Sequence, residues 1–131
     1  MRQHILFVED DADTRNVTTA MLERLGFRVR AEMEGLDALK AFSETPDLFD
    51  LALLDHGMAD IAGLELAQRF RRIRPGFPVI LYTGYFDTPS REQVEAAGIG
   101  GRVVIKPATM KELATALQEA LHGRAGSKTE L

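Results

Sequence analysis

The chain has 131 residues, of which 45% are apolar, so it can bury one hydrophobic core and we expect a single domain. It has 16 Lys and Arg residues and 20 Asp and Glu residues, and the resulting net charge of -4 disfavours direct binding to nucleic acid or to an anionic membrane. The sequence has no cysteine, which excludes disulfides and thiolate zinc sites.

The first part of the chain alternates short apolar runs with helical periodicity. Residues 5–8 are apolar on both faces, as expected of a central parallel strand covered by helices on both sides. Asp11 is the expected N-cap of the helix that follows. The apolar stripe predicted for this helix is Val17, Met21 and Leu25. Alternating residues over 27–31 then predict a half-exposed edge strand, and residues 35–44 predict a second helix.

The rest of the chain repeats this alternation. Apolar runs at 51–54, 79–82 and 103–105 predict three more strands, each followed by a stretch with helical features. Two of these helices begin with the spacing of a capping box, namely Ser90 with Gln93 and Thr109 with Glu112. The whole pattern predicts an α/β fold, a doubly wound five-stranded parallel sheet with about five helices.

Polar side chains stand where four of the predicted strands end. These residues are Asp10, Asp55, Thr83 and Lys106. Because all strands of a parallel sheet run the same way, the four side chains should share one crevice. Clustered carboxylates repel one another unless a cation is present, and hard oxygen ligands favour Mg²⁺ over zinc or copper. A carboxylate can act as a nucleophile, and an ammonium and a hydroxyl can bind phosphoryl oxygens, so the set indicates phosphoryl transfer to a carboxylate.

Four stretches of the chain resemble, in order, the motifs of receiver (CheY-like) domains of two-component response regulators. They are Phe7 to Asp11, Leu53 to Asp55, Leu81 to Gly84 and Ile105 to Pro107. The resemblance implies a flavodoxin-like sheet of order 2-1-3-4-5 and a phosphoacceptor switch rather than an enzyme. Residues 82–85 and 106–113 look more like receivers attached to hybrid sensor histidine kinases.

The resemblance also implies which residues hold the metal and the phosphoryl group. Asp55 would be the phosphoacceptor. Asp10 and Asp55 would bind Mg²⁺ directly, Glu9 would reach it through water, and the backbone carbonyl of Gly57 would be a further ligand. A phosphatase of similar chemistry would need a second carboxylate where Gly57 stands, so its general acid is missing.

The remaining implied roles concern the switch. Thr83 would move its hydroxyl onto the phosphoryl group, and Lys106 would pair with Asp55 before phosphorylation, next to a cis peptide bond to Pro107. Receiver domains usually have Tyr or Phe three residues before this lysine, whereas Val103 stands here. Because valine has few side-chain rotamers, we expect the Val103 surface to change shape less on phosphorylation than in typical regulators.

The roles of three residues next to the site, Tyr85, Phe86 and His56, have alternative interpretations. Tyr85 and Phe86 either shield the acyl phosphate from water or pack on the next helix. His56 should point to the face opposite Asp55 and is not expected to be a catalytic base. As an alternative function, a degenerate receiver would act as a constitutive protein-binding module, but the complete set of polar residues argues against it.

The expected domain boundaries and partners follow from the same resemblance. Residues 1–123 would form the receiver domain, and residues 124–131 a flexible tail or truncated linker. The expected partner is a sensor histidine kinase or a histidine phosphotransfer domain, and a homodimer would form through the last helix–strand–helix face. The N-terminus lacks a signal-peptide pattern and no apolar run could span a bilayer, so we expect a cytoplasmic location.

Overall fold

The structure, a computed structural model, describes residues 2–100 and 102–123. Its strands are β1 (His4–Val8), β2 (Arg28–Glu32), β3 (Leu51–Leu54), β4 (Val79–Thr83) and β5 (Val103–Ile105). Its helices are α1 (Ala12–Arg24), α2 (Gly35–Glu44), α3 (Gly63–Ile73), α4 (Arg91–Ala97) and α5 (Met110–Leu121). Short 3-10 turns cover Pro46–Leu48 and Tyr85–Asp87. The tail predicted at residues 124–131 lies outside the described residues.

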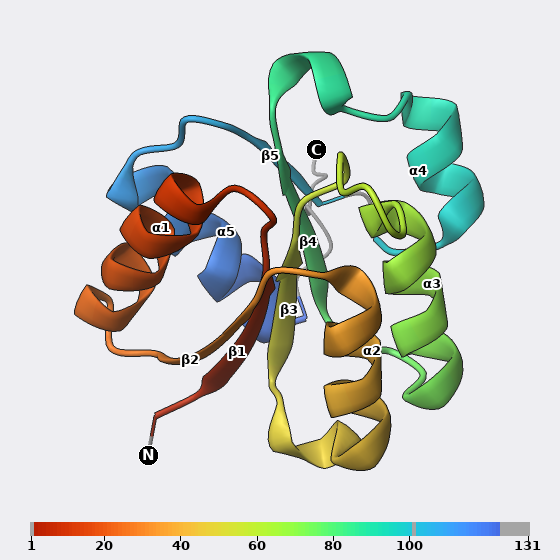
Figure 1. Ribbon diagram of the computed structural model, residues 1–131, viewed down its shortest axis with the longest axis horizontal. Coiled ribbons are helices and arrows are strands. Elements are labelled where there is room, and N and C mark those ends of the chain that lie inside the picture. Colours follow the sequence, from red (N-terminus) through yellow and green to blue (C-terminus); the bar gives the residue numbers. More distant parts are fainter. Residues whose placement is uncertain (1, 101, 124–131) are drawn as a thin grey trace.

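The five strands form one parallel sheet in the order β2-β1-β3-β4-β5. Helices α1 and α5 cover one face of the sheet, and α2, α3 and α4 cover the other (Figure 1). Successive side chains of β1 point to opposite faces of the sheet and enter two separate hydrophobic cores. Ile5 and Phe7 face α1 and α5, whereas Leu6 and Val8 face α2 and α3. The doubly wound fold, its strand order and the edge position of β2 are therefore confirmed.

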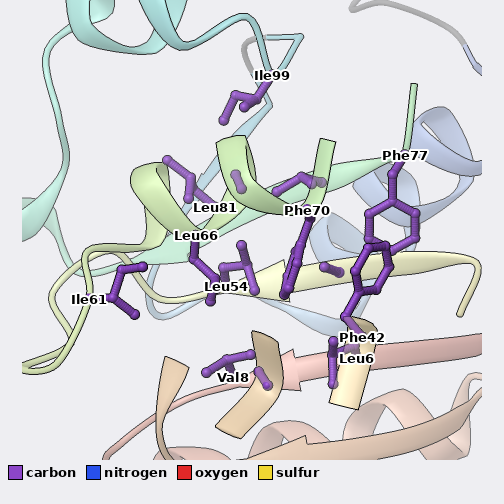
Figure 2. Close-up of a cluster of buried hydrophobic side chains, with 14 of the residues drawn as sticks. Leu6, Val8, Phe42, Leu54, Ile61, Leu66, Phe70, Phe77, Leu81 and Ile99 are labelled. Atoms are coloured by element: carbon purple, nitrogen blue, oxygen red, sulfur yellow. The ribbon is translucent and has the colours of Figure 1, made fainter. Parts of the chain in front are cut away.

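The core under α2 and α3 is built around aromatic rings. Figure 2 shows Phe42 of α2 beside Phe70 of α3 and Phe77 of the following loop. The centroid of the Phe42 ring lies 4.6 Å from that of Phe70 and 4.7 Å from that of Phe77. Burying each ring contributes about 1.5–3 kcal/mol. This packing fixes α2 and α3 on the sheet and thereby positions the loop after β3.

The buried stripe of α1 differs from the predicted one. Asp11 caps the helix as predicted, because its side chain accepts a hydrogen bond from Thr14 N–H at 2.9 Å. The helix buries Thr18 and Leu22, however, while Val17 is 62% exposed. The predicted stripe was therefore wrong at Val17. A stripe chosen by apolar character overlooks threonine, whose methyl group can be buried in a core.

The helix starts combine local caps with caps from other segments. Both predicted capping boxes are confirmed, at α4 and α5. For α2, the preceding Glu34 makes no side-chain cap bond among the described residues. Instead the carboxylate of Asp60, in the loop after β3, accepts hydrogen bonds from Gly35 N–H at 3.2 Å and Leu36 N–H at 2.9 Å. Asp60 thus ties the loop beside the strand ends to α2.

Two further features of the backbone bear on the predictions. The peptide bond between Lys106 and Pro107 is cis, as predicted. Across residues 2–100 and 102–123, no helix combines the length and apolar character that crossing a bilayer requires.

Candidate functional site

The strands bring the predicted polar side chains to one edge of the sheet, at the top of Figure 1. After β3, the N–H of Asp55 donates to the Val8 carbonyl at 3.1 Å, which sets Asp55 beside the end of β1. After β5, the N–H of Lys106 donates to the Thr83 carbonyl at 2.9 Å, which sets Lys106 beside the end of β4. The side chains at this edge are Glu9, Asp10, Asp55, Thr83 and Lys106.

Three of these residues form an acidic cluster. One carboxylate oxygen from each of Glu9, Asp10 and Asp55 lies within 4.8 Å of the other two. Glu9 and Asp55 are buried, whereas Asp10 is exposed. Burial raises the pKa of Glu9, because removing its charged form from water outweighs the hydrogen bond from Lys106. An oxygen-only donor set with one open side fits Mg²⁺ with its retained water ligands.

Lys106 neutralises part of this negative charge. Its Nζ lies 2.6 Å from Oε1 of Glu9 and 3.7 Å from Oδ2 of Asp55. The expected pairing with Asp55 is present, but the shorter ion pair is with Glu9, the more deeply buried carboxylate. Burial alone would lower the pKa of Lys106, but the hydrogen bond to Glu9 and the charge of Asp55 raise it above its ordinary value. The ammonium is therefore held in its charged form.

Thr83 carries a buried hydroxyl that lacks a hydrogen-bond partner in the described part of the chain. The residue is fully buried, and its Oγ1 makes no hydrogen bond to any described residue. A buried donor left unpaired costs free energy, and a phosphoryl oxygen nearby would satisfy it. With a buried carboxylate as nucleophile, an ammonium and this hydroxyl, the edge can support phosphoryl transfer to Asp55.

The exposure and contacts of Tyr85, Phe86, His56 and Val103 bear on the alternative roles considered for them. Tyr85 and Phe86 are 74% and 96% exposed, so they neither pack on α4 nor cover much of the site. Nδ1 of His56 accepts a hydrogen bond from Leu64 N–H at 3.3 Å, which engages it at the start of α3 rather than with Asp55. Val103 is half-buried and packs against the core under α2 and α3.

Two glycines allow close approaches at the site, namely Gly57 in the loop after β3 and Gly63 at the start of α3. A side-chain carbon on Gly63 would collide with the backbone carbonyl of Asp55. The N–H of Gly57 donates to Oδ1 of Asp55 at 3.3 Å, and a side-chain carbon on Gly57 would lie 2.9 Å from Cγ of Asp87. Sequence reasoning gave no sign of Asp87 beside Gly57, because Asp87 stands in no recognisable motif and only the fold brings it there.

Comparison with known sequences gives one clear family match. The model of the response regulator receiver domain matches residues 5–118. The chain is 35% identical over 118 residues to the transcriptional regulatory protein ZraR of Klebsiella oxytoca, covering 89% of this chain but only 26% of that protein. It is 29% identical over 119 residues to the response regulator receiver protein CpdR of Brucella abortus, covering 91% of this chain and 97% of that protein.

Comparison with solved structures agrees with this match. The receiver domain of the sensor histidine kinase PA1611 from Pseudomonas aeruginosa PAO1 superposes with a TM-score of 0.81 at 27% identity. The match covers 93% of this chain and 99% of that domain. That structure holds a magnesium ion coordinated in its active site cleft.

Proposed function

The chain belongs to the response regulator receiver domain family of two-component systems, and on this premise we propose that Asp55 is its phosphoacceptor. In this role a carboxylate oxygen of Asp55 attacks the phosphorus of a phosphohistidine. The P–N bond breaks, its electron pair returns to the imidazole, and an aspartyl phosphate forms. The protein is a signalling switch, and its activity toward phosphate is confined to its own aspartate.

One observation supports the proposal above all: at one sheet edge a buried carboxylate is grouped with two further acids, an ammonium and a buried hydroxyl that no described residue pairs with. Asp10 and Asp55 would hold Mg²⁺ directly, Glu9 through water, and Gly57 through its backbone carbonyl. When bound, the ion neutralises charge on the phosphoryl oxygens. Lys106, charged and next to Asp55, supplies the protein's own positive charge to the same oxygens.

Thr83 completes the proposed switch. Its Oγ1, which has no partner within residues 2–100 and 102–123, would donate a hydrogen bond to the phosphoryl group, and this bond would link the phosphorylation state to the end of β4. The alternative of a degenerate receiver is not favoured, because nucleophile, acids, lysine and hydroxyl are all present. A histidine kinase or phosphotransfer protein is the class of donor for this family. A homodimer through α4, β5 and α5, and an origin in a hybrid kinase, stay predictions.

The test is direct labelling. The protein is incubated with acetyl phosphate and Mg²⁺, and intact mass spectrometry measures the gain of one phosphoryl group. Asp55→Asn should abolish the gain, whereas Asp47→Asn, at the opposite end of β3, should leave it unchanged. Labelling that survives in Asp55→Asn would overturn the assignment.

Val103 predicts a modest output change. Because valine cannot make the large rotation of an aromatic ring, we expect small chemical-shift changes around β5 when beryllofluoride mimics the phosphoryl group. Residues around Thr83 should shift strongly in the same spectra. Large rearrangement at Val103 in amide NMR spectra would contradict this expectation.

A further inference from the structure

The carboxyl group of Asp87 lies at the mouth of the site, between two glycines. Asp87 ends the 3-10 turn after β4, and its N–H donates to the Gly84 carbonyl at 3.0 Å. A side-chain carbon on Gly57 would lie 2.9 Å from Cγ and 3.0 Å from Oδ2 of Asp87, and one on Gly84 would lie 3.8 Å from Oδ2. Gly57 is two residues after Asp55, and Gly84 directly follows Thr83. The carboxyl therefore occupies space that a side chain at Gly57 would fill, and it lies within contact distance of a side chain at Gly84.

This mouth is open to water. Neither glycine offers a side chain to cover it, and the two aromatic residues before Asp87 are largely exposed. The rings of Tyr85 and Phe86 lie 5.3 Å apart in an edge-on arrangement. Gly57 and Asp87 are themselves exposed, so water has access to the Asp87 carboxyl beside the loop that follows Asp55.

We propose that Asp87 orients the water molecule that hydrolyses the aspartyl phosphate, and so shortens the life of the phosphorylated state. The inference rests on Asp55 being the phosphoacceptor. An ionised carboxylate only accepts hydrogen bonds, so it holds a water by the water's O–H and turns a lone pair of the water oxygen away from itself. Asp87 approaches the site from the β4 side, across the loop that carries Gly57, and can present such a water to the phosphorus.

The hydrolysis balances without any further reactant. The water oxygen forms a bond to phosphorus, and the bond from phosphorus to the Asp55 oxygen breaks with its electron pair returning to the carboxylate. The water proton passes to bulk solvent, and inorganic phosphate leaves. Asp87 thus supplies a carboxylate in the space beside Gly57, which stands two residues after Asp55 and has no side chain of its own.

The first experiment measures the decay of the phosphorylated protein after removal of acetyl phosphate, by intact mass in the presence of Mg²⁺. Asp87→Ala should slow the decay by about tenfold, the rate equivalent of one hydrogen bond to a charged acceptor. The rate of phosphorylation and the affinity for Mg²⁺, measured by calorimetry, should stay within about twofold. Asp47→Ala, in the exposed 3-10 turn before β3, is the matched control and should decay as the wild type does.

A second variant, Gly57→Ala, displaces the Asp87 carboxyl without changing Asp87 itself. The added carbon of Gly57→Ala would push the exposed, flexible Asp87 side chain away from the site without breaking the core. Gly57→Ala should therefore slow the decay as well, and the double variant should decay no more slowly than the slower single variant.

Several outcomes would overturn the proposal. They are unchanged decay in Asp87→Ala, additive slowing in the double variant, and a loss of Mg²⁺ affinity that matches the slowing. Wild-type protein that never takes a phosphoryl group would instead refute the proposed function. The two failures are therefore distinguishable.

Discussion

Two residues of the site, Thr83 and Glu9, lower the stability of the folded protein, and the proposed function explains their presence. The hydroxyl of Thr83 is buried without a partner among the described residues, which costs the folded state free energy, and the proposed switch role explains why the group is there. Lys106 and Glu9 form the shortest ion pair of the site, and this pair lets a buried carboxylate remain beside Asp55. The site at this edge is thus less stable than an apolar one of the same shape would be.

Replacing the Thr83 hydroxyl tests this cost. Thr83→Val keeps the shape but removes the unpaired group, so the free energy of unfolding should stay equal or rise by about 1 kcal/mol. The same variant should lose the spectral change that beryllofluoride induces in the wild type. Urea unfolding and NMR measure the two effects. A clear loss of stability would show that the hydroxyl has a partner in solution.

His4, at the other end of β1, predicts a pH dependence. Burial and then the charge of Arg28 lower the pKa of His4 below 6.5. On acidification the unfolded chain therefore takes up a proton before the folded protein does, and the free energy of unfolding should fall as the pH drops through 6.5. Urea unfolding at pH 8, 7, 6 and 5.5 measures this decline. His4→Gln should flatten it, and an unchanged slope in that variant would assign the decline to other groups.

At the scale of elements, helix starts show how the site is held. α4 and α5 begin with caps that adjacent residues supply, whereas α2 depends on Asp60 from the loop after β3. The charged residues at the end of α3 likewise have structural tasks: Arg74 donates to the Pro46 carbonyl at 3.1 Å, and Arg69 pairs with Glu65 at 2.8 Å. Asp60 thus ties down the loop after β3, and Arg74 ties down the 3-10 turn before this strand.

The Asp60 cap gives an element-scale prediction. Asp60→Ala should lower the free energy of unfolding by about 1 kcal/mol, because the first N–H groups of α2 lose their acceptor. Asp60→Asn, which keeps a side-chain oxygen, should lose less. Equilibrium urea unfolding measures both, with Asp47→Ala as the control, which should stay within about 0.5 kcal/mol of wild type. Equal effects of the two Asp60 variants would contradict the capping role.

For the whole molecule, the acidic cluster couples stability to metal. Three carboxylates in close contact disfavour the folded state, and a cation that binds only this state stabilises it. Mg²⁺ at 100 times its dissociation constant should raise the free energy of unfolding by about 2.7 kcal/mol. Thermal unfolding with Mg²⁺ and with chelator measures the difference, and Asp10→Asn should remove most of it. If the melting temperature of the wild type is the same with Mg²⁺ and with chelator, the metal site is contradicted.

The sequence by itself determined the fold and the types of residue at the site. Strands that are apolar on both faces, followed by amphipathic helices, allow only a parallel sheet covered on both sides, and the polar residues that end such strands must meet at one edge. Local signals of this kind also placed the caps of α1, α4 and α5. For this reason Asp55, Thr83 and Lys106 could be named before any coordinates.

Only the tertiary structure decided which of these groups touch. It placed Lys106 closer to Glu9 than to Asp55, buried Thr18 in place of Val17, gave α2 its cap from Asp60 and set Asp87 against Gly57. Each of these depends on distances between segments far apart in the chain or on competition between neighbours for one space. Sequence periodicity indicates which face of a helix or strand a residue occupies, but it does not indicate which residue from another segment contacts it.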